Sequence, residues 1–223
     1  LREAGALLIG KTNMHELGVG VTGHNSHYGT PRNPYNAACH TGGSSSGSAA
    51  AVAAGLCPVA LGVDAGGSIR IPASFCGITG LKPTFGRIST AGSADLTWSV
   101  RHVGPLAASA TDVAIAYSIL AGPDPKDPYS LYQPLNGGNL WHPAQLDAWT
   151  IGVYEPWFRH ADGEVVEACE RMMAAYEEAG AEIRPVTIPD LEECRAAHLI
   201  TLGSELFAAW ERQYANHRTE FGL

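Results

Sequence analysis

The stretch TGGSSSGSAAAVAAGLCPVALGVDAGGSIRIPASFCGITGLKP, residues 41–83, decides the fold and contains the candidate chemistry. It holds two glycine–serine clusters, at Ser44 and at Ser68, separated by a run of small residues and an apolar run. Ser44–Leu56 is typical of a helix with a serine-rich start. Cys57–Val63 follows as a continuous apolar strand, of the type that is buried on both faces. A helix that runs out and a strand that runs back would bring the two clusters together.

The rest of the chain alternates between strand and helix patterns. We predict strands at 78–83, 150–154 and 181–189, and helices at 110–121, at 163–180 and from Asp190 onward. The segment 122–146 is rich in Pro, Gly and Asn and is typical of a long surface loop. Strands that alternate with helices indicate an α/β fold class.

Composition favours a globular protein. Of the 223 residues, 45% are hydrophobic and 16% are charged, and the net charge is −8. The few basic residues form no stripe, so nucleic acid is not an expected partner. Five scattered cysteines without a CxxC pair indicate a reducing, intracellular compartment and neither a metal site nor a disulfide framework. The sequence has no apolar stretch of transmembrane length and no signal peptide.

Two segments fit the patterns of cofactor-binding motifs, but neither has the neighbouring sequence that the motif requires. GALLIGKT, residues 5–12, fits the P-loop pattern, but Ala6–Ile9 is an apolar run typical of a strand, with Lys11 at its end. GVGVTG, residues 18–23, fits the dinucleotide pattern but follows polar residues instead of a strand. We therefore expect no cofactor. His24, His27 and His40 lack metal-ligand spacing, so no metal is expected.

The second glycine–serine cluster, DAGGSIR, is the candidate reaction centre. Its glycines allow the backbone N–H groups of Ala65, Gly66, Gly67 and Ser68 to converge as an oxyanion hole. Asp64, at the strand end, is placed to hold this loop by accepting backbone N–H bonds. The alternative is that both clusters are tight turns and helix caps. No Ser/His/Asp order is evident among the histidines, so the residues alone indicate only a possible serine acyl-transfer site.

The same residues resemble a known family. GGSSSGSAAAVAAG followed by GVDAGGSIRIPASFCGITGLKP resembles the amidase signature family. The resemblance extends through GKTNMHELG, NSHYGTPRNPYN and GPLAASATDVAIAYSILAG, and the later WFRHADGEVVEACERMM and IPDLEECRAAHLITLGSE are most similar to the plant-type fatty acid amide hydrolase branch. It implies an α/β amidase-signature fold, with a mixed β-sheet core covered by helices on both faces. It also implies one domain over 1–223, incomplete upstream and downstream.

The resemblance implies a Ser–cisSer–Lys triad. Ser68 matches the nucleophile, and Ser44 matches the bridging serine whose preceding peptide bond is cis. Lys11 and Lys82 match other family positions, so we expect the triad lysine upstream of Leu1. Gly18 matches a family position near the acyl channel. Arg70 is expected to anchor the Ser68 loop, and Cys76 is expected to be a buried apolar residue instead of a nucleophile.

The expected function is that of a serine hydrolase that cleaves a carboxylic amide, with an N-acylethanolamine-like fatty acid amide as the substrate. The alternatives are a broad-specificity short-chain or aryl amidase, the glutaminase subunit of a tRNA-dependent amidotransferase, and a catalytically dead amidase-like binding module. The resemblance also implies a homodimer. Peripheral membrane contact is compatible with a lipid substrate, and we expect a cytoplasmic or membrane-associated location.

Overall fold

The computed structural model describes residues 1–94, 96–133 and 146–222. The chain divides into two compact units, one formed by Leu1–Leu140 with Ile200–Leu223 and the other by Trp141–Leu199. Each unit is described by itself. The predicted single domain over 1–223 stays a prediction.

The first unit is built on a three-stranded antiparallel sheet. Its strands are β3 (Val59–Asp64), β4 (Thr79–Gly80) and β5 (His102–Ala107), in the order β3-β5-β4. The register of β3 and β5 runs from Val59 opposite Ala107 to Asp64 opposite His102. The last residue of β3 therefore faces the first residue of β5.

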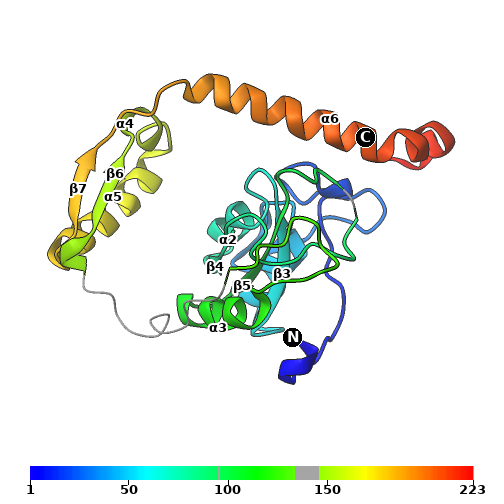
Figure 1. Cartoon of the computed structure of the whole chain (residues 1–223), viewed down its shortest axis with the longest axis horizontal. Helices are drawn as coiled ribbons and strands as arrows, with labels where there is room; N and C mark the ends of the chain where they lie inside the picture. Colours follow the sequence, from blue (N-terminus) through cyan, green and yellow to red (C-terminus); the bar gives the residue numbers. More distant parts are fainter. Residues whose placement is uncertain (95, 134–145, 223) are drawn as a thin grey trace. The chain divides into compact units, whose positions relative to one another are not determined.

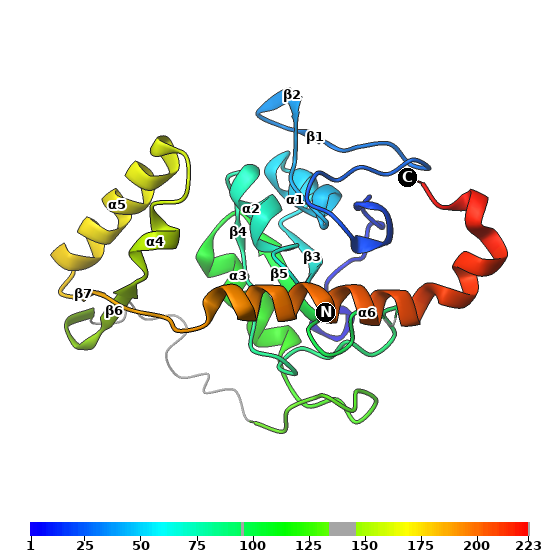
Figure 2. The same ribbon diagram turned by 90° about the horizontal axis from the view of Figure 1, so that it is seen from above.

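Helices cover this sheet on both sides. α1 (Ser46–Ala53) and α2 (Arg70–Phe75) lie on one side, and α3 (Ala110–Leu120) lies on the other (Figures 1 and 2). The helix predicted over 110–121 is confirmed, and the Ser109 hydroxyl caps it by accepting the N–H of Asp112. A core forms where α1 and α2 meet the sheet, from Ala49, Ile69, Ala73, Cys76 and Leu106.

Short elements precede the sheet. They are the 3-10 turns η1 (Arg2–Ala4) and η2 (Glu16–Gly18) and the hairpin of β1 (Arg32–Asn33) and β2 (Asn36–His40). The prediction of a strand at Ala6–Ile9 is wrong for the described structure, in which this run has no assigned secondary structure. The side chain of Leu7 is 88% exposed and that of Ile9 74%. Without a neighbouring strand, the backbone of this run has no ladder to join.

The prediction of β3 needs a second correction. The strand begins at Val59 instead of Cys57 and ends at Asp64. It pairs antiparallel, and Leu61 is 39% exposed, so the strand is not buried on both faces along its length. The predicted strand at 78–83 is present only as the two residues of β4.

The second unit contains a parallel pair of strands joined by helices. β6 (Thr150–Val153) pairs with β7 (Glu182–Pro185), and the connection carries α4 (Glu155–Phe158) and α5 (Gly163–Glu178). A 3-10 turn, η3 (Leu146–Ala148), precedes β6. The sequence predicted both strands and the longer helix. The surface loop predicted over 122–146 lies partly outside the described residues.

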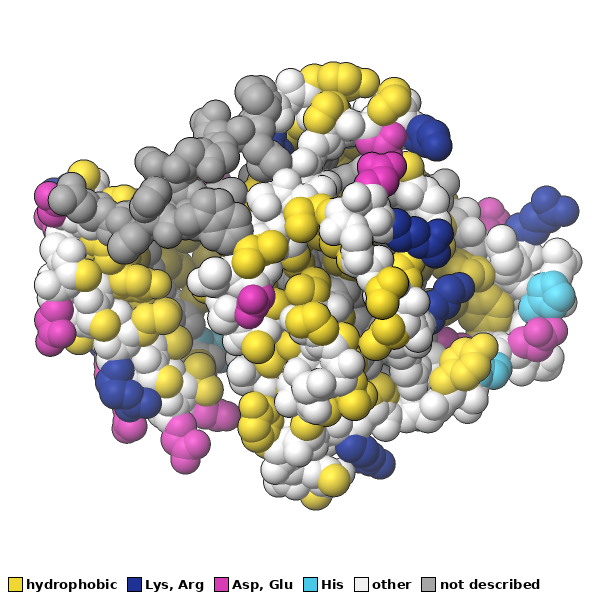
Figure 3. Space-filling model, turned by 90° about the horizontal axis from the view of Figure 1, so that it is seen from below, with side chains coloured by type: hydrophobic (Ala, Val, Ile, Leu, Met, Phe, Trp, Pro, Cys, Tyr) yellow, Lys and Arg dark blue, Asp and Glu magenta, His cyan; other side chains and the backbone are white. Residues whose placement is uncertain are grey.

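The long helix α6 (Leu191–His217) begins in the second unit and ends in the first, where η4 (Arg218–Glu220) follows it. The prediction of a helix from Asp190 onward is thereby confirmed. None of the helices in the described ranges is both long and apolar enough to cross a membrane. On the face shown in Figure 3, the basic side chains are dispersed among apolar and neutral ones.

Candidate active site

The two glycine–serine clusters meet in the structure. Ser44 and Ser45 immediately precede α1, and Ser68 lies in the loop between β3 and α2. The backbone N–H of Ser45 donates to the carbonyl oxygen of Ser68 at 3.1 Å. The contact predicted from a helix running out and a strand running back is therefore present.

Ser44 is buried, with 3% of its surface exposed. The Gly43–Ser44 peptide bond is cis, as the resemblance implied. The Ser44 carbonyl accepts the N–H of His15 at 3.0 Å and the hydroxyl of Ser46 at 3.2 Å. The Ser44 carbonyl is thus held by two donors, and its hydroxyl is the group that can act in chemistry.

Ser45 connects the start of α1 to β3. Its hydroxyl donates to the carbonyl of Val63 at 3.2 Å and accepts the N–H of Val63 at 3.1 Å. The close approach requires a glycine at position 62, where a Cβ would lie 2.7 Å from the Ser45 Oγ. Because its hydroxyl both donates to and accepts from the backbone of Val63, Ser45 connects the start of α1 to β3.

Asp64 organises the loop that carries Ser68. Its side chain is fully buried and accepts the N–H of Gly67 at 2.8 Å and of Ile69 at 3.1 Å. The guanidinium of Arg70 binds the same carboxylate through Nε at 3.0 Å and through a terminal nitrogen at 3.1 Å. The predicted roles of Asp64 and Arg70 as loop anchors are confirmed.

The hydrogen bonds of Asp64 determine its charge state. Burial alone would raise the pKa of this carboxyl group. The Arg70 guanidinium and the N–H groups of Gly67 and Ile69 outweigh burial, so the pKa of Asp64 lies below its usual value. The carboxylate is therefore ionised at neutral pH and holds the loop continuously.

The backbone N–H groups of the loop differ in whether they already donate a hydrogen bond within the protein. The N–H of Gly67 is committed to Asp64, and its φ of +118° suits only glycine. This leaves Ala65, Gly66 and Ser68 as candidate donors to an oxyanion. Gly66 is exposed and Ser68 is half-buried, so a substrate carbonyl can approach them.

Gly18 lies beside Ser44. A Cβ placed on Gly18 would lie 3.9 Å from the Ser44 Oγ and 3.4 Å from the terminal methyl group of Met14. Met14 also lines a pocket of about 950 Å³ within the first unit. The pocket wall therefore reaches the surroundings of Ser44.

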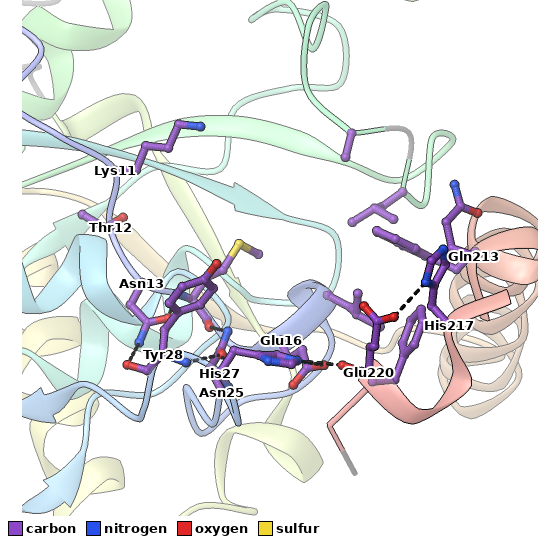
Figure 4. Close-up of a pocket in the computed structure, with 16 residues that line it drawn as sticks. Lys11, Thr12, Asn13, Glu16, Asn25, His27, Tyr28, Gln213, His217 and Glu220 are labelled. Carbon is purple, nitrogen blue, oxygen red and sulfur yellow. Dashed lines mark hydrogen bonds and ion pairs between the residues drawn. The ribbon is translucent and has the colours of Figure 1, made fainter.

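This pocket lies between the 11–28 segment and the end of α6 (Figure 4). Its apolar lining is formed by Met14, Leu17, Ala94, Leu96, Trp210 and Phe221. Polar groups lie along it: Glu16 with His27, and Glu220 with His217, are drawn near one another in Figure 4. Such a mixture suits a ligand with a long apolar part.

The remaining candidates have structural surroundings. Cys76 is fully buried, and burial raises the pKa of its thiol, which confirms the expectation of a buried apolar residue. The ammonium of Lys82 donates to the carbonyl of Pro83 at 3.2 Å. Lys11 is exposed, on the wall of the pocket.

Sequence reasoning missed β5 and its first residue, His102. The ring of His102 contacts the carbonyl of Asp64, at the start of the Ser68 loop. The GP pair at 104–105 concealed this strand, because proline is unusual in a central strand. Asp64 is the cross-strand partner of His102. Only the pairing of β3 with β5 would have indicated that His102 lies beside the Ser68 loop.

Comparison with known proteins identifies the family. The model of the amidase family matches residues 1–221, and the chain belongs to this family. A fatty acid amide hydrolase from Oryza sativa subsp. indica is 45% identical over 230 residues, with all of this chain and 38% of that protein covered. A glutamyl-tRNA(Gln) amidotransferase subunit from Maridesulfovibrio salexigens is 41% identical, with 99% and 46% covered.

A solved structure supports the fold. A crystal structure of an amidase is 37% identical to this chain and superposes with a TM-score of 0.85 over 99% of the chain and 47% of that protein. The fold class expected from the sequence is thereby confirmed. The chain spans less than half the length of these relatives.

Proposed function

We propose that the protein is a serine hydrolase that cleaves a carboxylic amide, with Ser68 as the nucleophile. The observation that carries the proposal is the hydrogen-bonded contact between the Ser44 and Ser68 clusters. The Ser45 N–H holds the Ser68 carbonyl, while the Asp64 carboxylate holds the N–H groups of Gly67 and Ile69, one residue before and one after Ser68. A nucleophile and a set of loop amides are thereby fixed beside a second, buried serine.

The reaction begins with transfer of the Ser68 proton through the Ser44 hydroxyl to a neutral lysine, while the Ser68 Oγ attacks the amide carbon. The oxyanion accepts hydrogen bonds from the backbone N–H groups of Ala65, Gly66 and Ser68, since that of Gly67 is bound to Asp64. Collapse of the intermediate breaks the C–N bond, and the amine leaves with the proton. Water then hydrolyses the acyl-enzyme, which releases the carboxylic acid and restores Ser68.

We assign the lysine to a position outside these 223 residues. None of the three lysines shares a described contact with Ser44: Lys11 is exposed on the pocket wall, Lys82 is bonded to Pro83, and Lys126 lies beside Asp127. The family pattern places the lysine before the GKTN segment. A lysine encoded upstream of Leu1 would complete the triad.

A fatty acid amide is the substrate class that we propose. The identity of 45% with a plant fatty acid amide hydrolase supports it. The pocket beside Met14 and Gly18 supports it as well, since an acyl chain needs a long, mainly apolar wall.

The glutaminase component of an amidotransferase is the second candidate. The identity of 41% with a glutamyl-tRNA(Gln) amidotransferase subunit favours it. Glutamine is short and polar, so its recognition requires charged groups close to Ser68. A direct competition between N-palmitoylethanolamine and glutamine separates the two candidates.

The proposal is tested by covalent labelling. The protein, expressed with all residues that its gene encodes upstream of Leu1, is treated with a short and with a long-chain fluorophosphonate and mapped by peptide mass spectrometry. We expect the adduct on Ser68, none in Ser68→Ala, and labelling slower by about 10²-fold or more in Ser44→Ala. Faster reaction with the long-chain probe supports a lipid amide.

Ser74→Ala is the matched control, because Ser74 is exposed on α2, six residues beyond Ser68. It should label at the wild-type rate. A folded wild-type protein that acquires no adduct on Ser68 would refute the enzyme proposal and favour a binding module.

A further inference from the structure

His102 is bonded to the start of the loop that carries Ser68. Its Nδ1 lies 3.2 Å from the carbonyl oxygen of Asp64 and 2.8 Å from that of Val100. Both neighbours are carbonyl oxygens, which only accept hydrogen bonds. The proton must therefore be on Nδ1, which donates to both oxygens.

The Asp64 carbonyl belongs to the same peptide unit as the N–H of Ala65. Gly43–Ser44 is the only cis bond in the described part of the chain, so the Asp64–Ala65 unit is trans. In a planar trans unit the C=O and N–H bonds point in opposite directions. A donor that fixes the Asp64 C=O therefore also fixes the direction of the Ala65 N–H.

We propose that His102 is a positioning residue for the oxyanion hole, and that its Nδ1–H aims the Ala65 N–H at the substrate oxyanion. This inference rests on the proposed function of Ser68. The loop is then held at two places. His102 fixes the peptide at 64–65, and the Asp64 carboxylate fixes the amides of Gly67 and Ile69.

The His102 ring is packed on one side, and its backbone is placed by the sheet. The ring packs edge-on against Phe85, with the centroids 5.5 Å apart. The pairing of β3 with β5 places His102 directly opposite Asp64. Burial, together with the nearby charge of Lys82, lowers the pKa of His102, which is consistent with a neutral ring.

Two substitutions separate positioning from packing. His102→Asn places an amide N–H near the position of Nδ1, whereas His102→Gln carries its N–H one carbon further, near the position of Nε2. Both are polar and similar in size. His102→Leu removes the donor, and Phe85→Leu is the control that loses the ring contact and leaves the Asp64 contact in place.

The variants are compared in the full-length protein by three measurements. These are the rate of Ser68 labelling by a long-chain fluorophosphonate, the kcat and KM for N-palmitoylethanolamine, and the Ki of a long-chain trifluoromethyl ketone. We expect His102→Gln and His102→Leu to lose about 10- to 100-fold in kcat, with KM changed by less than about twofold, because an oxyanion donor acts in the transition state. The Ki should weaken by the same factor as kcat/KM falls. His102→Asn should retain most of the activity, and Phe85→Leu should behave as the wild type.

The outcomes distinguish this inference from the function on which it rests. No Ser68 adduct in the wild type overturns both. An adduct in the wild type with equal rates in His102→Asn and His102→Gln overturns the role of His102 alone. So does a loss in all variants, Phe85→Leu included, that follows their melting temperatures. If His102→Leu fails to fold, the comparison of Asn with Gln decides.

Discussion

At the scale of single residues, Asp64 holds more of the candidate site in place than its neighbours do. Its buried carboxylate binds two backbone N–H groups and the Arg70 guanidinium. Asp64→Asn replaces one acceptor oxygen by a donor that faces other donors. We expect the free energy of unfolding to fall by about 2–3 kcal/mol, below the usual cost of breaking a buried ion pair because Arg70 is 54% exposed. Urea denaturation at neutral pH measures the loss.

The pH dependence of this loss tests the assigned cause. The pKa of Asp64 is lowered in the folded protein, so its contribution is present above the unfolded value of about 3.9 and is lost as the pH falls through the folded pKa. The difference in stability between wild type and Asp64→Asn should therefore shrink as the pH is lowered from about 6 to about 3. A difference that stays constant over this range would show that packing, and not charge, is responsible.

Residues with a local signature were predictable, and those defined by tertiary contacts were not. The anchoring role of Asp64 follows from its place between an apolar strand and two glycines. The positions assigned to Ser44 and Ser68 followed from a long family resemblance, and their roles stay predictions. His102 has no local signature, because its contact with Asp64 exists only after β3 and β5 pair.

At the scale of elements, the errors concern strands. A strand needs a partner, and a local pattern does not contain that partner. Ala6–Ile9 has the composition of a strand and is exposed. β5 contains Pro105 and still forms the middle of its sheet. The helices were predicted more closely, because their caps and periodicity are local.

The packing of α1 on β3 leads to a prediction about Gly62. A Cβ at this position would lie 2.7 Å from the Ser45 Oγ and 2.8 Å from a methyl group of Leu106. Gly62→Ala should lower the free energy of unfolding by about 1–3 kcal/mol, as overpacking of a core does. It should also slow Ser68 labelling, because Ser45 holds the Ser68 carbonyl.

Gly203→Ala in α6 is the matched control, since its Cβ would meet nothing within 4 Å and its backbone is helical. This substitution should raise the free energy of unfolding by about 0.5–1 kcal/mol. Denaturation curves of both variants check the pair. A neutral Gly62→Ala would contradict the tight contact between α1 and β3.

At the scale of the whole molecule, residues far apart in sequence close the pocket of the first unit. The Glu16 carboxylate accepts the N–H of Gly222 at 2.7 Å across 206 residues, and it accepts the Ser26 hydroxyl at 2.8 Å. His27 bonds the carbonyl of Glu220 at 2.7 Å. No local pattern predicts such contacts, because the two segments meet only once the chain has folded.

The Glu16 contact predicts a long-range change in hydrogen exchange. Glu16→Ala removes the acceptor for the Gly222 N–H, so amide exchange in residues 218–222 should quicken by about 2- to 10-fold, the range set by a net hydrogen bond of about 0.5–1.5 kcal/mol. Glu220→Ala is the control, because its exposed carboxylate pairs with His217 while its main-chain carbonyl still accepts His27. Exchange measured by mass spectrometry should change less in this control. Equal exchange in Glu16→Ala and wild type would mean that α6 and η4 are held by their apolar contacts alone, chiefly those of Trp210 and Tyr214 with Phe221.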